Sequence, residues 1–152
     1  MILPIITYPN PILEKKTRKI KEEEIKSPEI KELIFDMLET MDANNGIGLA
    51  ATQVGKSVRL CIIKLGNKTH ILINPKFKSK SWKKVVAEEG CLSFPGQYFP
   101  VKRSARVKVN ALNKNGKEIT ISADGLFARA LQHEIDHLDG ILFISKKVKS
   151  KK

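Results

Sequence analysis

Residues 132–140 read QHEIDHLDG, and the interpretation of the whole chain starts from this stretch. Its two histidines, His133 and His137, lie four residues apart. On an α-helix this spacing places both rings on one face, where they can bind a single metal ion. Glu134 directly follows the first histidine. The alternative interpretation is a pair of core histidines without a metal.

The residues around this stretch have a helical pattern. Between Gly125 and Gly140, apolar residues recur at intervals of three and four, namely Leu126, Phe127, Ala130, Leu131, Ile135 and Leu138. This periodicity predicts a largely buried helix that ends at the second glycine.

The rest of the chain combines one more helix with several short strands. Ser27 as N-cap, Pro28 at the first helical position and Gly46 as the stop predict an N-terminal amphipathic helix. Segments rich in β-branched residues predict strands at 58–64, 70–75, 83–89, 106–112 and 117–122. Asn115-Gly116 favours a hairpin turn between the last two strands. Because strands and helices do not alternate regularly, we expect an α+β fold with antiparallel sheets.

The chain has 152 residues, of which 41% are hydrophobic, and this suits one domain with a sizeable core. We expect a single domain over residues 1–145, followed by a lysine-rich tail at 146–152. The two cysteines, Cys61 and Cys91, are too few and too isolated for a secreted disulfide framework, which favours a reducing compartment.

The N-terminus, MILPIITYPNP, lacks a basic region and is interrupted by prolines, so it resembles neither a signal peptide nor a transit peptide. No apolar run is long enough to span a membrane. We therefore expect a cytoplasmic protein of a bacterium or a phage-infected host, or an organellar one, without a membrane partner.

The formal charge of +12 results from 28 Lys and Arg against 16 Asp and Glu, and it suggests a polyanionic neighbour. Much of this charge is diffuse, and the densest run is SKKVKSKK at 145–152. Without interleaved aromatic residues or a nucleic-acid-binding motif, we expect solvated lysines and no sequence-specific DNA binding.

A catalytic metal site needs a third protein ligand, and the sequence after the histidines does not offer one. Six residues after His137, where metzincin proteases carry another histidine, stands Phe143, and no glutamate follows Glu134. The candidates therefore lie upstream, and they are Cys61, His70, Glu88, Glu89 and Cys91.

Cys91 is the strongest of these candidates. It stands in EEGCLSFPG, residues 88–96, which we interpret as a strand end followed by an exposed irregular loop. Cys61 lies within a predicted strand, where a free cysteine behaves as a small hydrophobic residue. A four-ligand structural zinc site made by both cysteines and both histidines remains an alternative, although such sites usually take their cysteines from a close pair.

Taken together, three separated segments resemble the motifs of peptide deformylases. They are GIGLAATQ at 46–53, EGCLS at 89–93 and QHEIDHLDG at 132–140. The resemblance covers most of the chain and implies antiparallel sheets packed around a central metal-binding HExxH helix. The chain stops near FISKKVKSKK, so it resembles a shortened form without the C-terminal helix of most members.

The resemblance also implies a role for individual residues. Cys91, His133 and His137 correspond to the metal ligands, and Glu134 to the general base. The family's oxyanion donors match the Gln53 side chain and the Leu92 backbone N–H. Residues matching the family's substrate-binding positions are Gly46, Ile47, Gly48, Gly90 and Leu126. Ala87 and Ala130 are small, and Tyr98 stands where several members carry an arginine, so the pocket is expected to differ in shape.

The implied reaction is the hydrolysis of the N-formyl group from the initiator methionine of nascent peptides, which releases formate. The implied cofactor is one divalent metal ion, Fe2+ in the cell, with Zn2+, Ni2+ or Co2+ as substitutes. The basic tail is a candidate for electrostatic contact with the ribosome.

Two functions of other classes remain open at this level. One is a metallopeptidase of the HExxH type, and the other is a basic structural protein that binds zinc or RNA. A peptidase lacks its downstream ligand here, and a structural protein has no need of Glu134 beside the first histidine.

Overall fold

The computed structural model describes residues 1–149. In chain order its helices and strands are α1 (Glu22–Ile25), α2 (Pro28–Ala43), β1 (Gly48–Ala50), β2 (Leu60–Leu65), β3 (Lys68–Lys80), β4 (Lys84–Cys91), β5 (Phe94–Ser104), β6 (Arg106–Leu112), β7 (Glu118–Asp124) and α3 (Gly125–Leu138). Short 3₁₀ turns lie at Pro11–Glu14, Ala51–Val54 and Phe143–Lys146.

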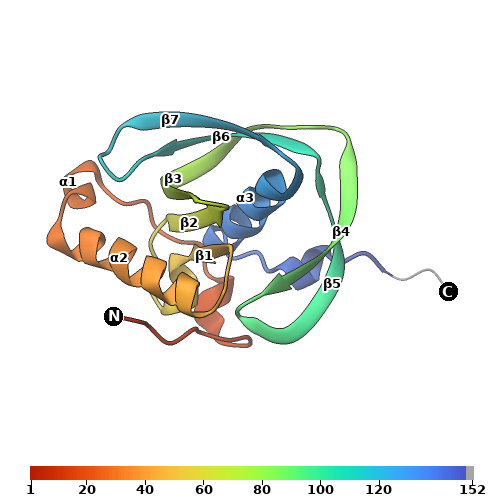
Figure 1. The fold of residues 1–152 in the computed structure, drawn as a ribbon, viewed down its shortest axis with the longest axis horizontal. Coiled ribbons are helices and arrows are strands. Elements are labelled where there is room, and N and C mark those ends of the chain that lie inside the picture. The colour runs from red at the N-terminus through yellow and green to blue at the C-terminus, as the bar shows by residue number, and fades with distance from the viewer. Residues whose placement is uncertain (150–152) are drawn as a thin grey trace.

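The strands form two antiparallel sheets, which confirms the predicted mixture of helices and antiparallel strands. One sheet has the order β1-β2-β3-β6-β7, and the other is the hairpin of β4 and β5. Helix α3 packs against strands of both sheets and is enclosed between them (Figure 1). The fold therefore surrounds the helix that carries QHEIDHLDG.

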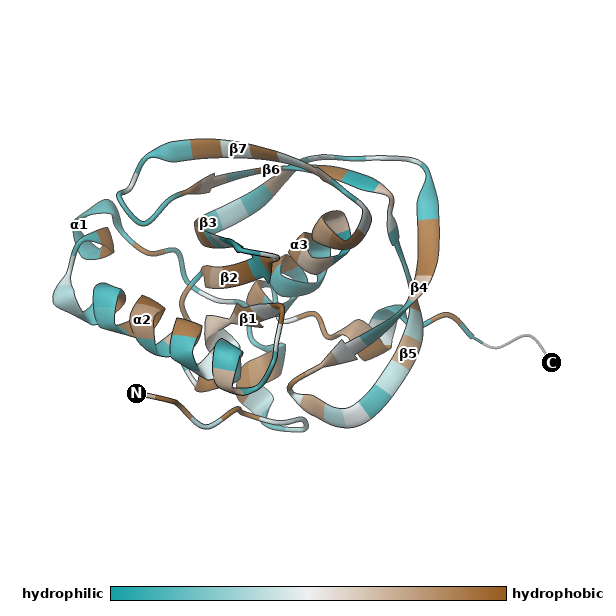
Figure 2. Ribbon diagram, in the orientation of Figure 1, coloured by the Kyte–Doolittle hydropathy of each residue, from teal (hydrophilic) through white to brown (hydrophobic). Residues whose placement is uncertain are grey.

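Helix α2 begins and ends through side-chain and backbone caps. Ser27 Oγ accepts a hydrogen bond from Ile30 N at 3.3 Å, as its N-cap position predicts. The helix ends earlier than the predicted stop, because Asn45 adopts the left-handed conformation at φ 55° and Gly46 N–H donates to Met41 O at 3.0 Å. Hydrophobic residues recur along α2 (Figure 2), and those facing the core cover β1 and β2.

The stretch after Cys91 corrects the sequence analysis, which expected an irregular loop there. Strand β4 continues through Cys91, and β5 starts at Phe94, two residues later. A β-bulge separates the Gly90–Tyr98 pair from the Cys91–Phe94 pair. It accommodates Pro95 and Gly96, residues that usually interrupt a regular ladder. Strand β1 was also missed, since three residues carry too little periodicity.

Gly140 follows α3 in the left-handed conformation, at φ 74°, as its predicted role as a helix stop requires. A Cβ atom at this position would lie 2.6 Å from the backbone oxygen of Glu14. We expect Gly140→Ala to lower the free energy of unfolding by about 2–4 kcal/mol, because backbone strain and a backbone clash add. Denaturant unfolding measures this loss.

Gly66 provides the matched control for this substitution. It has a similar left-handed φ of 59°, but a Cβ there would meet no atom within 4 Å. Gly66→Ala therefore reports the backbone strain alone, at about 1 kcal/mol. Equal losses in the two variants would contradict the clash at Gly140.

The predicted lysine-rich tail is described as far as residue 149. Lys147 forms an antiparallel bridge with Val101, and Val148 N–H donates to Pro100 O at 2.7 Å. Residues 150–152 of the predicted tail lie outside the described residues. Within residues 1–149, no helix combines the length and the hydropathy that crossing a membrane requires.

Candidate metal centre

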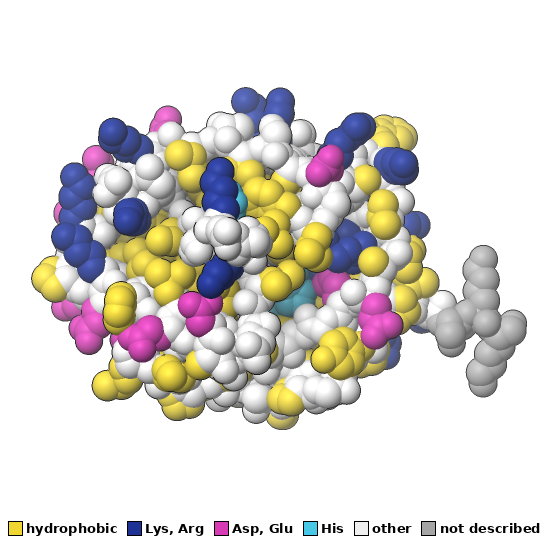
Figure 3. Space-filling model, in the orientation of Figure 1, with side chains coloured by type: hydrophobic (Ala, Val, Ile, Leu, Met, Phe, Trp, Pro, Cys, Tyr) yellow, Lys and Arg dark blue, Asp and Glu magenta, His cyan; other side chains and the backbone are white. Residues whose placement is uncertain are grey.

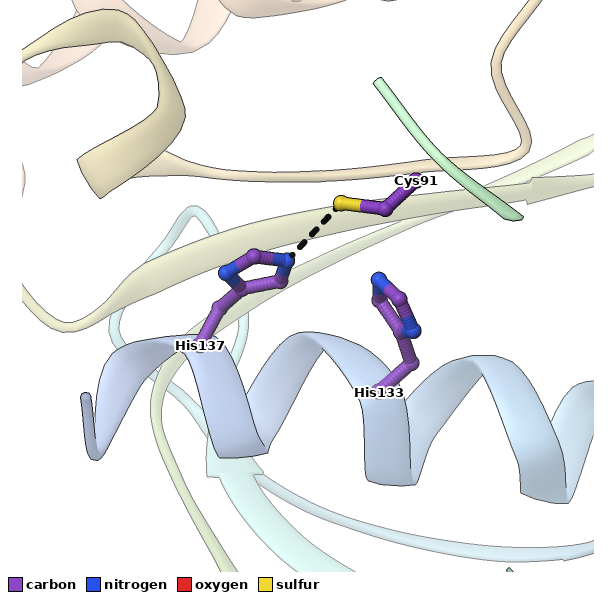
Figure 4. Close-up of side chains that lie close together, drawn as sticks. All are labelled: Cys91, His133 and His137. Atoms are coloured by element: carbon purple, nitrogen blue, oxygen red, sulfur yellow. Dashed lines mark hydrogen bonds between the residues drawn. The ribbon is translucent and has the colours of Figure 1, made fainter. Parts of the chain in front are cut away.

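Three metal-binding side chains meet between α3 and the end of β4. The ligand atoms of Cys91, His133 and His137 all lie within 4.8 Å of one another. Cys91 Sγ lies 3.3 Å from His137 Nε2, and the ring of His133 faces the same point (Figure 4). The two histidines come from successive turns of α3, as their spacing predicts.

The other upstream candidates lie apart from this cluster. Cys61 is fully buried within β2, where burial raises its thiol pKa well above the ordinary range. His70 stacks on Phe127 with 4.6 Å between ring centroids. These positions argue against the four-ligand structural zinc site and leave an S, N, N donor set.

This donor set fits a metal ion. A thiolate and two imidazoles suit zinc, iron, cobalt and nickel, and three protein ligands leave one coordination position open. The carboxylate of Glu89 binds His133 Nδ1 at 2.9 Å, which leaves Nε2 to face Cys91. A carboxylate on the outer nitrogen of a ligating histidine is typical of metal sites, because it fixes the orientation of the ring.

The electrostatics of the cluster also favour a cation. Burial lowers the pKa of His133, but Glu134, Cys91 and Glu89 outweigh this effect and raise it to about 10. Burial lowers the pKa of His137 well below its ordinary value. The negative neighbours that hold a proton on His133 favour a metal cation at the same place.

A buried ion-pair network supports Glu89, and the sequence analysis did not identify it. Arg103 Nε and Nη2 donate to the two Glu89 oxygens, both at 2.9 Å, while Arg103 Nη1 donates to Asp136 at 2.6 Å. Arg129 also pairs with Glu89. One signal was available: Glu89 lies two residues before Cys91, so strand alternation places both on the same face.

Glu134 lies beside the cluster. Burial raises the pKa of its carboxyl group to about 7, against the lowering effects of His133 and Arg103. Among the described residues its buried Oε1 has no hydrogen-bond partner, and Oε2 faces Gly48 closely enough that a Cβ there would lie 2.5 Å away. A carboxyl group in this environment is free to exchange a proton near neutral pH.

Gln53 approaches the cluster from the 3₁₀ turn Ala51–Val54. Its Oε1 accepts from Ala50 N at 3.0 Å, which directs Nε2 towards Ser93 Oγ at 3.1 Å and Cys91 Sγ at 3.5 Å. The amide is therefore fixed, with its donor end beside the thiolate.

A cavity of about 630 Å³ opens over these residues. Of the residues that the sequence analysis selected, Gly46, Ile47, Gly48, Gln53, Gly90, Cys91, Leu92, Tyr98, Leu126, Ala130, His133 and Glu134 line it. Ala87 does not. Leu126 corrects the predicted buried stripe of α3, since 57% of it is exposed, as is 46% of Ile47. Such exposed apolar side chains around a cavity mark a binding surface.

The comparisons with known proteins agree on one family. The sequence model of a family described as polypeptide deformylase matches residues 2–152. A peptide deformylase of Thermodesulfovibrio yellowstonii is 49% identical over 150 residues, covering 95% of this chain and 88% of the relative. The crystal structure of peptide deformylase from Thermotoga maritima superposes with a TM-score of 0.92 at 37% identity, covering 98% and 99% of the two chains. A class I type b peptide deformylase of Acinetobacter baumannii bound to Met-Ala-Ser matches with a TM-score of 0.92 at 32% identity, covering 96% and 98%.

Proposed function

The chain belongs to the peptide deformylase family, and on this basis we propose which of its residues bind the metal, the formyl group and the peptide. The protein is a metal-dependent hydrolase that removes the N-formyl group from formylated nascent peptides. The observation that supports its residue roles best is the meeting of Cys91, His133 and His137 beside the cavity.

Cys91, His133 and His137 would hold the metal, Fe2+ in the cell, with Zn2+, Ni2+ or Co2+ as substitutes. When bound, the metal supplies Lewis acidity and lowers the pKa of water in its open position. Glu134 then takes the proton from the attacking water and returns it to the leaving amine. Its pKa of about 7 suits both directions of transfer at neutral pH.

Gln53 and the Leu92 backbone N–H stabilise the oxygen of the formyl group as it becomes negative. Nε2 of Gln53 already points towards Cys91, because the other end of the amide is held by Ala50 N. Donors that are fixed before the reaction stabilise developing charge without reorganisation.

The peptide binds along β1 as an added strand. β1 is an edge strand of the five-stranded sheet, and Gly46, Ile47 and Gly48 line the cavity beside it. Extended peptides bind such free edges through backbone hydrogen bonds, while side-chain pockets provide specificity. Ile47, Leu126 and Ala130 form the apolar pocket for methionine, opposite Gly90 and Tyr98.

Formate release from formyl-Met-Ala-Ser, measured on metal-replete protein, tests this function. Mass spectrometry of the products distinguishes deformylation, which leaves Met-Ala-Ser intact, from cleavage of an internal peptide bond by a metallopeptidase. An intact formyl peptide after incubation with folded, metal-replete protein would refute the assignment.

The close packing of Gly48 against Glu134 yields a prediction. Because an added Cβ would lie 2.5 Å from Glu134 Oε2, Gly48→Ala must displace the base. We expect kcat/KM to fall about 10- to 100-fold, the usual effect of moving a catalytic group by about 1 Å. Gly46→Ala is the control, since its Cβ would meet only the flexible Leu92 side chain at 3.0 Å. Equal losses in both variants would attribute the effect to the peptide-binding strand instead.

For the whole chain, we propose one deformylase domain over residues 1–145 in the cytoplasm, with the tail at 146–152 in electrostatic contact with the ribosome. Deleting residues 146–152 is expected to reduce co-sedimentation with ribosomes at low salt, because lysines bind RNA phosphates by releasing counterions. Co-sedimentation that is indifferent to both salt and the deletion would contradict this role.

A further inference from the structure

The connection between β3 and β4, Ser81-Trp82-Lys83, lies outside the deformylase site and displays the only tryptophan of the chain. Trp82 is 96% exposed. A large apolar side chain that a fold leaves wholly in water is unusual and often marks a binding surface. The metal centre and the peptide cavity make no use of it.

The backbone of this connection is fixed although the Trp82 ring is exposed. Ser81 N–H donates to Arg106 O at 2.9 Å, and Arg106 N–H donates back to Ser81 Oγ at 3.0 Å. On the other side of the tryptophan, Ala105 N–H donates to Lys83 O at 2.8 Å. The ring is therefore presented from a rigid turn, which reduces the entropy lost when a ligand packs on it.

Two hollows with basic walls adjoin this turn and share Lys80. One, of about 160 Å³, is lined by Lys80, Lys84, Lys102 and Lys146, and the other, of about 430 Å³, by Lys80, Arg106 and Lys108 together with serine hydroxyls. We call these six residues the basic track. Figure 3 shows Lys and Arg side chains beside hydrophobic ones at the upper right, where Figure 1 places the β3–β4 connection.

The charge of the basic track is poorly compensated. Within residues 1–149, Lys146 is the one member with an ion pair, at 3.5 Å from Asp136, and Asp136 is already bound by Arg103 at 2.6 Å. Asp124 lines only the far end of the larger hollow. The pKa of Lys80 is lowered, chiefly by burial and further by Lys146, Lys84 and Arg103. A bound anion would relieve this repulsion.

We propose that the basic track and Trp82 bind a single-stranded polynucleotide, with phosphates in the two hollows and one base stacked on the indole. Proteins that bind single strands combine a positive groove for the backbone with exposed aromatic rings for the bases. Concave sites with hydroxyl groups suit phosphate oxygens, whereas a flat bilayer cannot enter them. This site is independent of deformylation.

Trp82 itself reports on the binding, because it is the only tryptophan. We expect oligouridylate of about ten nucleotides to quench its fluorescence and to raise the anisotropy of a labelled oligonucleotide with the same midpoint. Oligothymidylate in parallel shows whether RNA or DNA is the preferred source of the strand. Trp82→Ala is expected to weaken binding about 5-fold or more, while Phe35→Ala, which removes another exposed aromatic ring on α2, leaves it unchanged.

A pair of double variants tests the charge. Lys102→Glu with Lys108→Glu removes one exposed lysine from each hollow, and Lys31→Glu with Lys114→Glu changes the net charge equally outside the basic track. We expect the first variant to bind about 10-fold or more weakly and to lower the slope of log K against log salt by about 1, and the second to bind like the parent. All four variants should keep formate release, which verifies their folding.

Three results would overturn the proposal. The first is equal weakening by both double variants, which would show that only net charge matters. The second is binding of the oligonucleotide without any change in Trp82 fluorescence, or equally tight binding of polyphosphate, which has no bases. The third is a response of Trp82 to phosphatidylglycerol vesicles but not to oligonucleotides, which would identify a membrane surface.

Discussion

Replacing Glu134 with glutamine is expected to lower kcat for formyl-Met-Ala-Ser by about 10²- to 10⁴-fold, the usual contribution of a general base. The amide has the shape of the carboxylate but cannot take a proton from water. Because Glu134 is not one of the three clustered ligand residues, metal content should stay the same. Formate release and metal analysis of the same sample measure both quantities.

Glu88 is the matched control, since it also lines the cavity but is exposed to solvent. Glu88→Gln is expected to keep kcat within a few-fold of the parent. Folding of Glu134→Gln should be intact, because the substitution removes a buried charge whose Oε1 has no partner among the described residues. A Glu134→Gln variant that keeps more than about a tenth of kcat would remove Glu134 from its proposed role.

The parts of this fold that follow local rules could be predicted from the sequence. The N-cap at Ser27, the strand segments rich in β-branched residues and the left-handed Gly140 each depend on a few neighbouring residues. The β4–β5 hairpin could not be predicted in full, because Pro95 and Gly96 are local breakers of a strand. A bulge against β4 accommodates them, and this pairing is a tertiary contact that the local pattern does not contain.

The site shows the same division. Helical spacing predicts the His133 and His137 pair, but the distance of the cysteines from α3 depends on the whole fold. The Glu89, Arg103 and Asp136 network joins β4, β5 and α3, so its charges look like ordinary surface residues in the sequence. The basic track is also assembled from separate segments, which explains why the chain's lysines seemed diffuse and Trp82 isolated.

The two cysteines provide the second large prediction, which tests the metal ligands directly. Cys91→Ala removes the only sulfur donor of the cluster, whereas Cys61→Ala changes a fully buried residue within β2. We expect Cys91→Ala to lose nearly all bound metal in the presence of a weak chelator and to lower formate release about 10³-fold or more, because two imidazoles alone hold the ion weakly.

Cobalt-substituted protein separates loss of a ligand from loss of the fold. A thiolate bound to Co2+ gives an intense near-ultraviolet charge-transfer band, which should be present in the parent and in Cys61→Ala but absent in Cys91→Ala. Cys61→Ala should lose stability, as removal of a core side chain does, and keep its metal. If the band instead disappears in Cys61→Ala and persists in Cys91→Ala, the ligand comes from the core strand and the assignment of Cys91 is wrong. If it weakens in both variants, the four-ligand alternative must be reinstated, because a structural site needs all of its donors, whereas the proposed catalytic site needs only the thiolate that faces the cavity.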